Sequence, residues 1–377
     1  MKKIKFAIIG CGLMGKEFAS AAARWNHLNQ DIAAPEIIAV ADSNLAALDW
    51  FKEKVPSVKY AFEDYRDVLK LSEVQAVYCA LPHVLHEEVY CEIIRAKKHL
   101  FGEKPFGMDL LQNSSILRAI EENPEVFVRC SSQYPFFPGC QELIKWIRDK
   151  KCGRIIEISA GIRHSSDLDQ NKPINWKRQR EINGEYGCMG DLGIHVEHVP
   201  FRLGFIPKRV YAQLSNIITS RPDGKGGITN CDTWDNAILN CDVVQDGYEF
   251  PMKLEMKRIA PGSTNEWFLE VYGLESSVKF TTNDPNSFCF TQSFGKEQAW
   301  CRVNVGYKPQ FAAITGSIFE FGFPDAILQM WAAFMLELTN HEVGFGCFTP
   351  KEAALSHALH TAALRSNENR EAVEIVC

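Results

Sequence analysis

A glycine-rich turn near the amino end constrains the fold of this chain more than any other feature. The sequence FAIIGCGLMG places Gly10, Gly12 and Gly15 in the pattern G-x-G-x-x-G, between an apolar run at residues 4–9 and a helical pattern at residues 14–26. Glycines at these positions allow a tight turn, close approach of the backbone to a pyrophosphate, and packing of the helix on the strand. Its position at the first strand of a βαβ unit favours dinucleotide binding over an incidental glycine turn.

The rest of the first third alternates short apolar runs with amphipathic segments, as a parallel sheet with crossover helices requires. Strands are expected at residues 4–9, 36–41, 74–81, 99–103 and 126–131, and helices at 14–26, 43–54, 84–97 and 108–122. From about residue 153 the pattern becomes that of an antiparallel sheet, because long alternating runs lack helix-length spacers. Further strands are expected at 153–162, 209–218, 233–244, 249–258 and 266–272, and closing helices at 326–338 and 350–365.

Length and composition narrow the class of protein. A chain of 377 residues exceeds the roughly 250–300 residues at which single hydrophobic cores stop growing, which suggests two domains. A formal net charge of -6 gives no reason to expect nucleic acid or an anionic membrane as a partner. No apolar run approaches the about 20 residues of a membrane span, and the apolar run that ends at Gly10 is short for a signal peptide. Thirteen cysteines without a CxxC pair favour a reducing cytoplasm over a disulfide framework or a zinc ribbon.

An acidic residue ends the second expected strand. Asp42, in IIAVADSN, can accept hydrogen bonds from the adenosine ribose hydroxyls and would repel a 2′-phosphate, so NAD is favoured over NADP. It lies 27 residues after Gly15, somewhat more than the usual about 20. A role as helix cap for the stretch that starts at Ser43 is compatible with the same position.

Two further stretches follow strands and so lie at the carboxyl edge of the parallel sheet, where ligands of open α/β sheets bind. These are CALPHVLHEE and FGEKPFG. Pro105 biases Lys104 toward an extended conformation, which can aim its ammonium group outward from the strand end. Lys104 is therefore either a ligand for an anionic or alkoxide-like oxygen or a solvated surface lysine.

The segment CMGDLGIHVEHV places Asp191, His195 and His198 at spacings of four and three, on one face of a helix. Such a face is a metal site, a catalytic acid/base pair or ordinary buried packing. Spacing alone does not decide among the three.

Four stretches in this order and spacing, IIGCGLMG, ALPHVLHEE, GEKPFG and YGCMGDLGIHVEHVPFRLG, resemble the Gfo/Idh/MocA family of nicotinamide-dependent oxidoreductases over essentially the whole chain. The resemblance implies an α/β protein, with a doubly wound Rossmann domain at residues 1–131. A second α/β domain at residues 132–377 would be built on a large open, mainly antiparallel sheet. The implied substrate is a sugar, inositol or related polyol. Because an open sheet face usually needs a cover, we also expect a homo-oligomer, dimer or tetramer, joined through the second domain.

The resemblance also implies roles for individual residues. Lys104 matches the lysine of the family's Glu-Lys-Pro motif, and Asp191 and His195 match the acid and histidine of its second catalytic motif. His195 would accept the proton of the substrate hydroxyl, Lys104 would stabilise the developing alkoxide, and Asp191 would position the sugar. The residues expected at the cofactor are Gly10, Cys11, Gly12, Leu13, Met14, Gly15, Asp42, Ser43, Leu81, Pro82, His83, His86, Glu103, Lys104 and Gln133.

Substrate contacts are expected from Tyr134, Arg163, Trp176 and Lys177 in addition to Asp191 and His195. Trp176 can offer an apolar ring face to a sugar, and Lys177 or Arg178 can bind hydroxyls or an acidic group. Trp176 as interface core and the basic run as a solvated face are the alternatives. His164, beside Arg163, is a similar but unspecific candidate.

This sequence departs from the family pattern at three positions. His83 stands where asparagine is common, His198 where aspartate is common, and Pro135 where arginine is frequent. These departures affect cofactor detail and substrate choice. His198 is expected to have a packing or supporting role, and no bound metal is expected.

Two other stretches are expected to be structural. RPDGKGGIT at residues 221–229 lacks the strand-to-helix context of a phosphate loop and is interpreted as a mobile connection between strands. His357 and His360 share a face of a late helix and are interpreted as surface or packing residues.

The leading hypothesis is a cytoplasmic dehydrogenase that moves a hydride between a secondary hydroxyl of a sugar, inositol or sugar derivative and NAD, with NADP possible. The alternatives are an NAD-dependent, redox-assisted glycosidase of the same superfamily and a catalytically silent dinucleotide-binding regulator. The joint presence of Lys104, Asp191 and His195 argues against the silent regulator.

Overall fold

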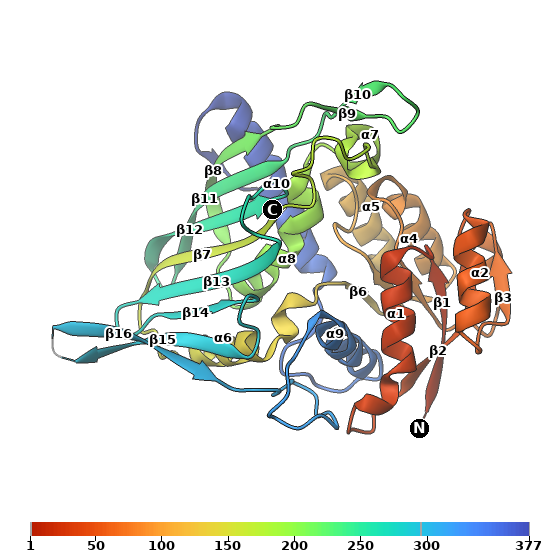
Figure 1. The fold of residues 1–377 in the computed structure, drawn as a ribbon, viewed down its shortest axis with the longest axis horizontal. Helices are drawn as coiled ribbons and strands as arrows, with labels where there is room; N and C mark the ends of the chain where they lie inside the picture. The colour runs from red at the N-terminus through yellow and green to blue at the C-terminus, as the bar shows by residue number, and fades with distance from the viewer. Residues whose placement is uncertain (1, 295, 377) are drawn as a thin grey trace.

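The computed structural model describes residues 2–294 and 296–376. The amino-terminal third of the chain forms a six-stranded parallel sheet in the order β3-β2-β1-β4-β5-β6, at the right of Figure 1. Its strands are β1 (Lys3–Ile9), β2 (Ala34–Ala41), β3 (Tyr60–Phe62), β4 (Ala76–Cys79), β5 (His99–Gly102) and β6 (Val128–Cys130). The order reverses between β1 and β4, which is the point where doubly wound sheets open a crevice for a ligand.

Crossover helices connect these strands and cover the sheet. They are α1 (Leu13–Ala23), η1 (Trp25–His27), α2 (Leu45–Lys54), α3 (Tyr65–Leu69), η2 (His83–Leu85), α4 (His86–Arg95) and α5 (Leu110–Glu121). Strand β4 is buried along its whole length, as a sheet covered on both faces requires.

One helix from the far end of the chain returns to this sheet. In α9 (Phe323–Leu338), the Trp331 ring stacks on Phe18 of α1, with ring centroids 3.5 Å apart, and also meets the edge of Phe6 in β1. We therefore propose that the amino-terminal domain consists of residues 1–131 together with α9, which packs on its sheet. The other residues of 132–377 form the second domain.

The second domain is built on a nine-stranded sheet in the order β16-β15-β14-β13-β7-β12-β11-β8-β17. The pair β7 and β12 is parallel and the other pairs are antiparallel. Its strands are β7 (Ile155–His164), β8 (Pro207–Ser215), β11 (Asn236–Gln245), β12 (Tyr248–Lys257), β13 (Asn265–Gly273), β14 (Val278–Thr281), β15 (Ser287–Phe294), β16 (Glu297–Asn304) and β17 (Val373–Glu374).

Three longer helices, α6 (Pro138–Arg148), α8 (Cys188–Arg202) and α10 (Pro350–Asn369), pack on one face of this sheet, behind it in Figure 1. The short elements of this domain are η3 (Tyr134–Phe136), η4 (Trp176–Arg178), α7 (Arg180–Asn183), β9 (Ser220–Pro222) and β10 (Ile228–Asn230). Gly193 allows α8 to approach α10, because a Cβ there would lie 2.4 Å from His360 Nε2. Within residues 2–294 and 296–376, every helix is too short or too polar to cross a lipid bilayer.

The predicted fold class is confirmed, and each expected helix and strand has a counterpart within a few residues. The patterns missed the short elements β3, α3, α7, β9, β10 and β17, the helix α6, and the strands β14 to β16. Strand β3 is only three residues long, and β16 is exposed along nearly its whole length, so no burial periodicity marks it. The stretch at 221–229 forms the turn between the antiparallel strands β9 and β10, as expected of a connection between strands.

Candidate active site

The glycine turn has an open side toward solvent. Gly10 has φ +95°, and a Cβ there would lie 2.3 Å from Ala80 O, so only glycine fits. A Cβ on Gly15 would lie 2.5 Å from Gly10 O, which explains the close packing of α1 on β1. A Cβ on Gly12 meets no atom within 4 Å, and no side chain caps the amino end of α1 that follows. This uncovered helix terminus fits the pyrophosphate of a dinucleotide.

Asp42 lies beside this turn. Its Oδ2 accepts a hydrogen bond from the Cys11 backbone N–H at 2.7 Å, and its Oδ1 accepts one from the Asn44 N–H at 2.8 Å. Asn44, not Asp42, caps helix α2, since its side chain accepts a hydrogen bond from the Ala46 N–H. The alternative role of Asp42 as a helix cap is therefore wrong. The carboxylate is held at the end of β2, where a ribose would lie.

The predicted residues after β4 lie at the carboxyl edge of the parallel sheet. His83 is buried in η2, where its Nδ1 lies 3.0 Å from Asn183 O, and His86 Nε2 lies 3.1 Å from Leu81 O. Burial lowers the pKa of both rings, to about 3 for His86, so both are neutral at neutral pH. Leu81 and Pro82 are half-buried beside them.

The predicted residues after β5 and β6 lie at the same edge. The Glu103 carboxylate accepts hydrogen bonds from Tyr78 and Ser131, so it supports the sheet. Gln133 is buried after β6. In the glycine turn itself, Leu13 is strongly exposed and Met14 half-buried, while Ser43 is exposed beside Asp42.

Three cations surround the carboxylate of Asp191, which is 2% exposed. Lys104 Nζ lies 2.6 Å from Oδ1, Lys177 Nζ lies 2.9 Å from Oδ1 and 3.1 Å from Oδ2, and Arg258 Nη2 lies 3.1 Å from Oδ2. Burial alone would raise the pKa of Asp191, but Lys104, Lys177 and Arg258 hold it well below its usual range. Asp191 is therefore ionised at neutral pH.

Four separate segments supply this cluster. Asp191 lies in the first turn of α8, where the helix dipole also favours a negative charge. Lys104 follows β5, Lys177 lies in η4, and Arg258 directly follows β12. The Arg258 Nη1 group also donates to Lys177 O at 2.9 Å, which ties the lysine segment to the end of the strand.

One turn along α8, His195 faces the same cluster. Its Nδ1 lies 3.3 Å from Ser132 Oγ, and its carbonyl accepts a hydrogen bond from Trp267 Nε1 at 2.8 Å. Burial, with Lys104 and Lys177 nearby and Asp191 opposing, lowers the pKa of His195 to about 3. The ring is therefore neutral at physiological pH, and among the described residues none hydrogen-bonds its Nε2.

Two predicted aromatic residues line the same region. Tyr134 meets the edge of the His195 ring, with centroids 5.3 Å apart, and stacks on Trp267 at 5.9 Å. Burial raises the pKa of Tyr134, so its hydroxyl is neutral. Trp176 lies edge to face with His83, with centroids 4.8 Å apart. Because His83 comes from the parallel sheet and Trp176 from the second domain, this contact joins the two halves of the site.

Arg163 does not lie at this site, and its predicted substrate contact is wrong. Its side chain lies on the opposite face of the nine-stranded sheet, where Nε donates to Glu255 at 3.0 Å and the guanidinium stacks on Phe268. Side chains alternate along a strand, so the neighbouring His164 takes the inner face instead. Burial lowers the pKa of His164 to about 4, with Asp191 opposing and Arg258 adding to the effect.

Arg178 is structural although Lys177 beside it reaches the site. Arg178 is fully buried, forms an ion pair with Asp235, and donates to Ile218 O at 3.0 Å. The two basic neighbours thus separate into one site residue and one that anchors the segment.

The remaining histidines of α8 and α10 pack in the interior. His198 is fully buried between Phe345 and Phe348, at centroid distances of 4.9 and 5.0 Å, in agreement with a packing role. His357 and His360 are also buried rather than at the surface: His357 Nε2 lies 2.9 Å from Pro105 O, and His360 Nε2 lies 2.7 Å from Glu197 Oε1. In the part of the chain that the structure describes, no group of three or more His, Cys, Asp or Glu side chains is placed to hold a metal ion.

Arg258 is the site residue that the sequence patterns missed. It ends an alternating strand, EMKRIAPG, and its charge looks like that of any residue at a strand end. The one available signal is a basic residue at the point where a strand pattern stops, before Pro261 and Gly262.

Comparison with known proteins identifies the chain at this point. The model of an oxidoreductase family with an NAD-binding Rossmann fold, Gfo/Idh/MocA, matches residues 4–130. Residues 4–130 therefore match the NAD-binding domain of this family. The chain is 25% identical over 299 residues to the levoglucosan dehydrogenase of Pseudarthrobacter phenanthrenivorans, an alignment that spans 74% of each chain. It is also 30% identical over 214 residues to the inositol 2-dehydrogenase of Pseudarthrobacter chlorophenolicus, over 55% of this chain and 60% of the relative.

The solved structures extend the likeness to the whole fold of the chain. A levoglucosan dehydrogenase in complex with NADH and levoglucosan has a TM-score of 0.90 at 20% identity, and the match covers 100% of both chains. The fold of both domains is therefore shared with that structure.

Proposed function

We propose that this protein is an NAD-dependent dehydrogenase that moves a hydride between a secondary hydroxyl of a sugar, inositol or related polyol and the nicotinamide. The observation that carries the proposal is the meeting of Lys104, Asp191 and His195 at the carboxyl edge of the glycine-turn sheet. Relatives that act on levoglucosan and inositol support this substrate class.

The chain supplies the proton chemistry of this reaction. His195 is neutral, and its Nε2 accepts the proton of the substrate hydroxyl, while Ser132 at Nδ1 orients the ring. Lys104 donates to the same oxygen and stabilises the negative charge that develops there. Asp191 positions Lys104 and offsets the positive charge of protonated His195.

The cofactor supplies the hydride acceptor at its nicotinamide ring. Gly10, Gly12 and the amino end of α1 would hold its pyrophosphate, and Asp42 would hold the adenosine ribose and disfavour a 2′-phosphate. The residues expected near the nicotinamide are His83, His86, the Glu103 backbone and Gln133, which all lie at the carboxyl edge.

A panel of sugars, inositols, uronates and glycosides, each incubated with NAD or NADP, tests this proposal. Reduced cofactor measured at 340 nm with a free sugar or polyol is the expected result, with NAD preferred. Release of sugar from a glycoside without net NADH would instead identify the redox-assisted glycosidase. Absence of both reactions would overturn the proposed function.

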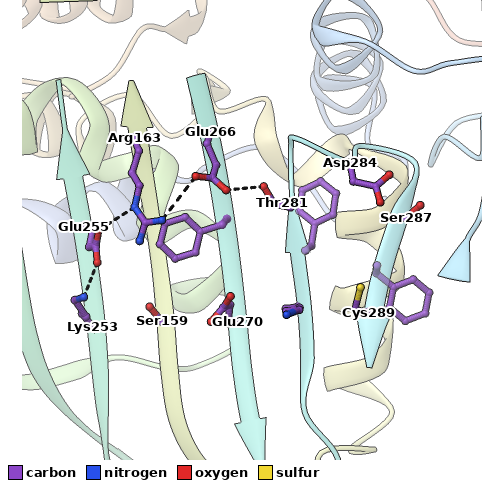
Figure 2. A pocket seen from close by; sticks show the side chains of 14 residues that line it. Ser159, Arg163, Lys253, Glu255, Glu266, Glu270, Thr281, Asp284, Ser287 and Cys289 are labelled. Carbon is purple, nitrogen blue, oxygen red and sulfur yellow. Dashed lines mark hydrogen bonds and ion pairs between the residues drawn. The ribbon is translucent and has the colours of Figure 1, made fainter. Parts of the chain in front are cut away.

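We also propose that the protein forms a dimer or tetramer through the open face of the nine-stranded sheet. A hollow of about 250 Å³ lies on this face. Figure 2 shows side chains of adjacent strands directed into it, with Arg163 joined to Glu255 and Glu266. Phe268, Phe280 and Phe288 form the floor of the hollow but are nearly buried, so a second subunit would mainly contact its charged side chains. Light scattering of the purified protein tests this, and a monomer would contradict it.

We also propose that the protein is located in the cytoplasm. The twelve cysteines within the described residues are all free thiols, and most of them are buried. Cell fractionation with an antibody against the chain tests it, and recovery from a secreted or membrane fraction would contradict it.

A further inference from the structure

The candidate active site holds more positive charge than its own acidic groups balance. Lys104, Lys177 and Arg258 converge on one carboxylate, that of Asp191. Both oxygens of that carboxylate are occupied, Oδ1 by the two lysines and Oδ2 by Lys177 and Arg258. Asp191 offsets one of the three charges, which leaves an excess of two.

Two acidic groups near the cluster are paired with cations of their own. Asp167 accepts a hydrogen bond from Lys172 at 3.1 Å, and Asp235 is bonded to Arg178 in a fully buried ion pair. Neither pair changes the balance. Glu103, directly before Lys104, does change it, because this buried carboxylate accepts its hydrogen bonds from the neutral hydroxyls of Tyr78 and Ser131 and so reduces the excess to one positive charge.

The histidines of the site are uncharged. Burial lowers the pKa of His195 to about 3 and that of His164 to about 4, and burial with Lys104 nearby lowers the pKa of His83. The excess of positive charge therefore persists at neutral pH.

Uncompensated charge inside a protein is costly unless a ligand balances it. The proposed reaction passes the hydroxyl proton to His195, so the negative charge that develops on the oxygen beside Lys104 is matched by the positive charge that develops on the His195 ring. The excess positive charge therefore has no partner in the reaction chemistry.

We propose that the substrate is an acidic sugar, a polyol or sugar that carries a carboxylate, and that this carboxylate binds to Lys177. The inference rests on the proposed dehydrogenase function and names its substrate class. A carboxylate carries one negative charge, which matches the remaining excess, whereas a phosphate dianion exceeds it.

Exposure selects Lys177 among the three cations. Its side chain is 38% exposed, against 16% for Lys104 and 1% for Arg258. Arg258 cannot reach a ligand, and Lys104 is committed to the reacting oxygen. Lys177 also lies beside Trp176, with Nζ 5.7 Å from the ring centroid, so one segment presents an apolar face to the sugar and a charge to its carboxylate.

Matched pairs of sugars test this inference: glucose with glucuronate, galactose with galacturonate and mannose with mannuronate. Turnover is followed by NADH absorbance, and binding to the enzyme–NADH complex is followed by calorimetry. We expect kcat/KM and affinity to favour the acid by about ten- to hundredfold, the range for a charge-assisted hydrogen bond. Added salt should reduce this preference.

Variants of Lys177 test whether this residue causes the preference for the acidic sugar. Lys177→Met should lower the acid-to-neutral ratio of kcat/KM by at least about tenfold, mostly through KM, and Lys177→Arg should retain most of it. Arg180→Met is the matched control, because Arg180 lies three residues further along, is 62% exposed and pairs with Glu185. The control should leave the ratio unchanged.

Each other outcome overturns a stated part of the proposal. Neutral sugars oxidised as well as or better than their acids would overturn the acidic-sugar inference and leave the dehydrogenase intact. Stronger binding of glucose 6-phosphate than of glucuronate would overturn the assignment to a carboxylate. An equal loss of preference in Arg180→Met would overturn the role of Lys177. If no sugar or acid binds or reacts, the dehydrogenase proposal fails and the inference fails with it.

Discussion

The glycine turn and the Asp191 cluster form the two sides of the site, and they are built in opposite ways. The turn is made of six consecutive positions from Gly10 to Gly15, and its shape follows from the absence of side chains at Gly10 and Gly15. The cluster is made of charges from four segments between residues 104 and 258, and its shape follows from long-range packing. The turn is formed by the backbone of consecutive residues, whereas the cluster forms only when the folded chain brings distant residues together. Substitutions should therefore have different signatures on the two sides.

The largest expected effect comes from the proton-transfer residues of the cluster. His195→Asn and Lys104→Met should each lower kcat by about 10²–10⁴-fold, because each removes a group that handles the substrate proton or the developing charge. Fluorescence titration should show NADH binding close to that of the parent protein. His341→Ala, at an exposed position, is the control. Nearly parental turnover by either variant would remove that residue from the mechanism.

Arg258 should show that the cluster is also a folding element. Arg258→Met leaves Asp191 with two lysines and removes the bond to Lys177 O, so the free energy of unfolding should fall by about 3 kcal/mol, as when a buried ion pair loses a partner. Arg180→Met, in an exposed pair, should cost under about 1 kcal/mol. Urea denaturation measures both. Equal stability of the two variants would contradict a structural role for Arg258.

At the glycine turn, two variants should separate an effect on cofactor binding from an effect on folding. Gly12→Val places its side chain in open space, so stability should hardly change, while NADH affinity should fall by about ten- to hundredfold because the pyrophosphate loses its approach to the backbone. Gly15→Val places its side chain 2.5 Å from Gly10 O and should lower the melting temperature instead. Normal NADH affinity in a folded Gly12→Val protein would refute the placement of the pyrophosphate.

Asp42 should affect the choice between NADH and NADPH at the glycine turn more than cofactor binding itself. Asp42→Ala removes the acceptor proposed for the ribose hydroxyls and the repulsion of a 2′-phosphate, so the preference for NADH over NADPH should fall by about tenfold. Titration of both reduced cofactors measures the ratio. A parent protein that binds NADPH more tightly would show that Asp42 does not face the ribose.

The smallest effect is an expected absence of change with pH. The pKa of His195 is lowered to about 3, so the ring stays neutral and kcat/KM should vary by less than about twofold between pH 5.5 and 7.5. The free energy of unfolding, in contrast, should depend on pH through His195. The unfolded chain takes up a proton below pH 6.5, so this stability is fully present above pH 6.5 and is lost as pH falls toward 3. An inflection of kcat/KM near pH 6.5 would contradict the burial of His195.

Prediction from sequence succeeded where a residue's placement depends on its immediate neighbours. The glycine turn, Asp42 after β2 and Lys104 after β5 lie at the carboxyl edge of the parallel sheet, as predicted, because parallel strands present their carboxyl ends at one edge. Arg163 was placed on the wrong face, since a strand alternates its faces and the sequence does not show which face the helices cover. Arg258 was missed for a related reason, because its partners are remote in the chain.

The sequence by itself determined the parallel sheet, its cofactor turn and the helix face that carries Asp191 and His195. These features follow from glycine conformation and from the periods of strand and helix, which act over a few residues. Only the tertiary structure decided that Lys104, Lys177 and Arg258 share one carboxylate and leave an excess of positive charge for a substrate. Charges act through space, so a balance among four distant segments exists only once packing has brought them together.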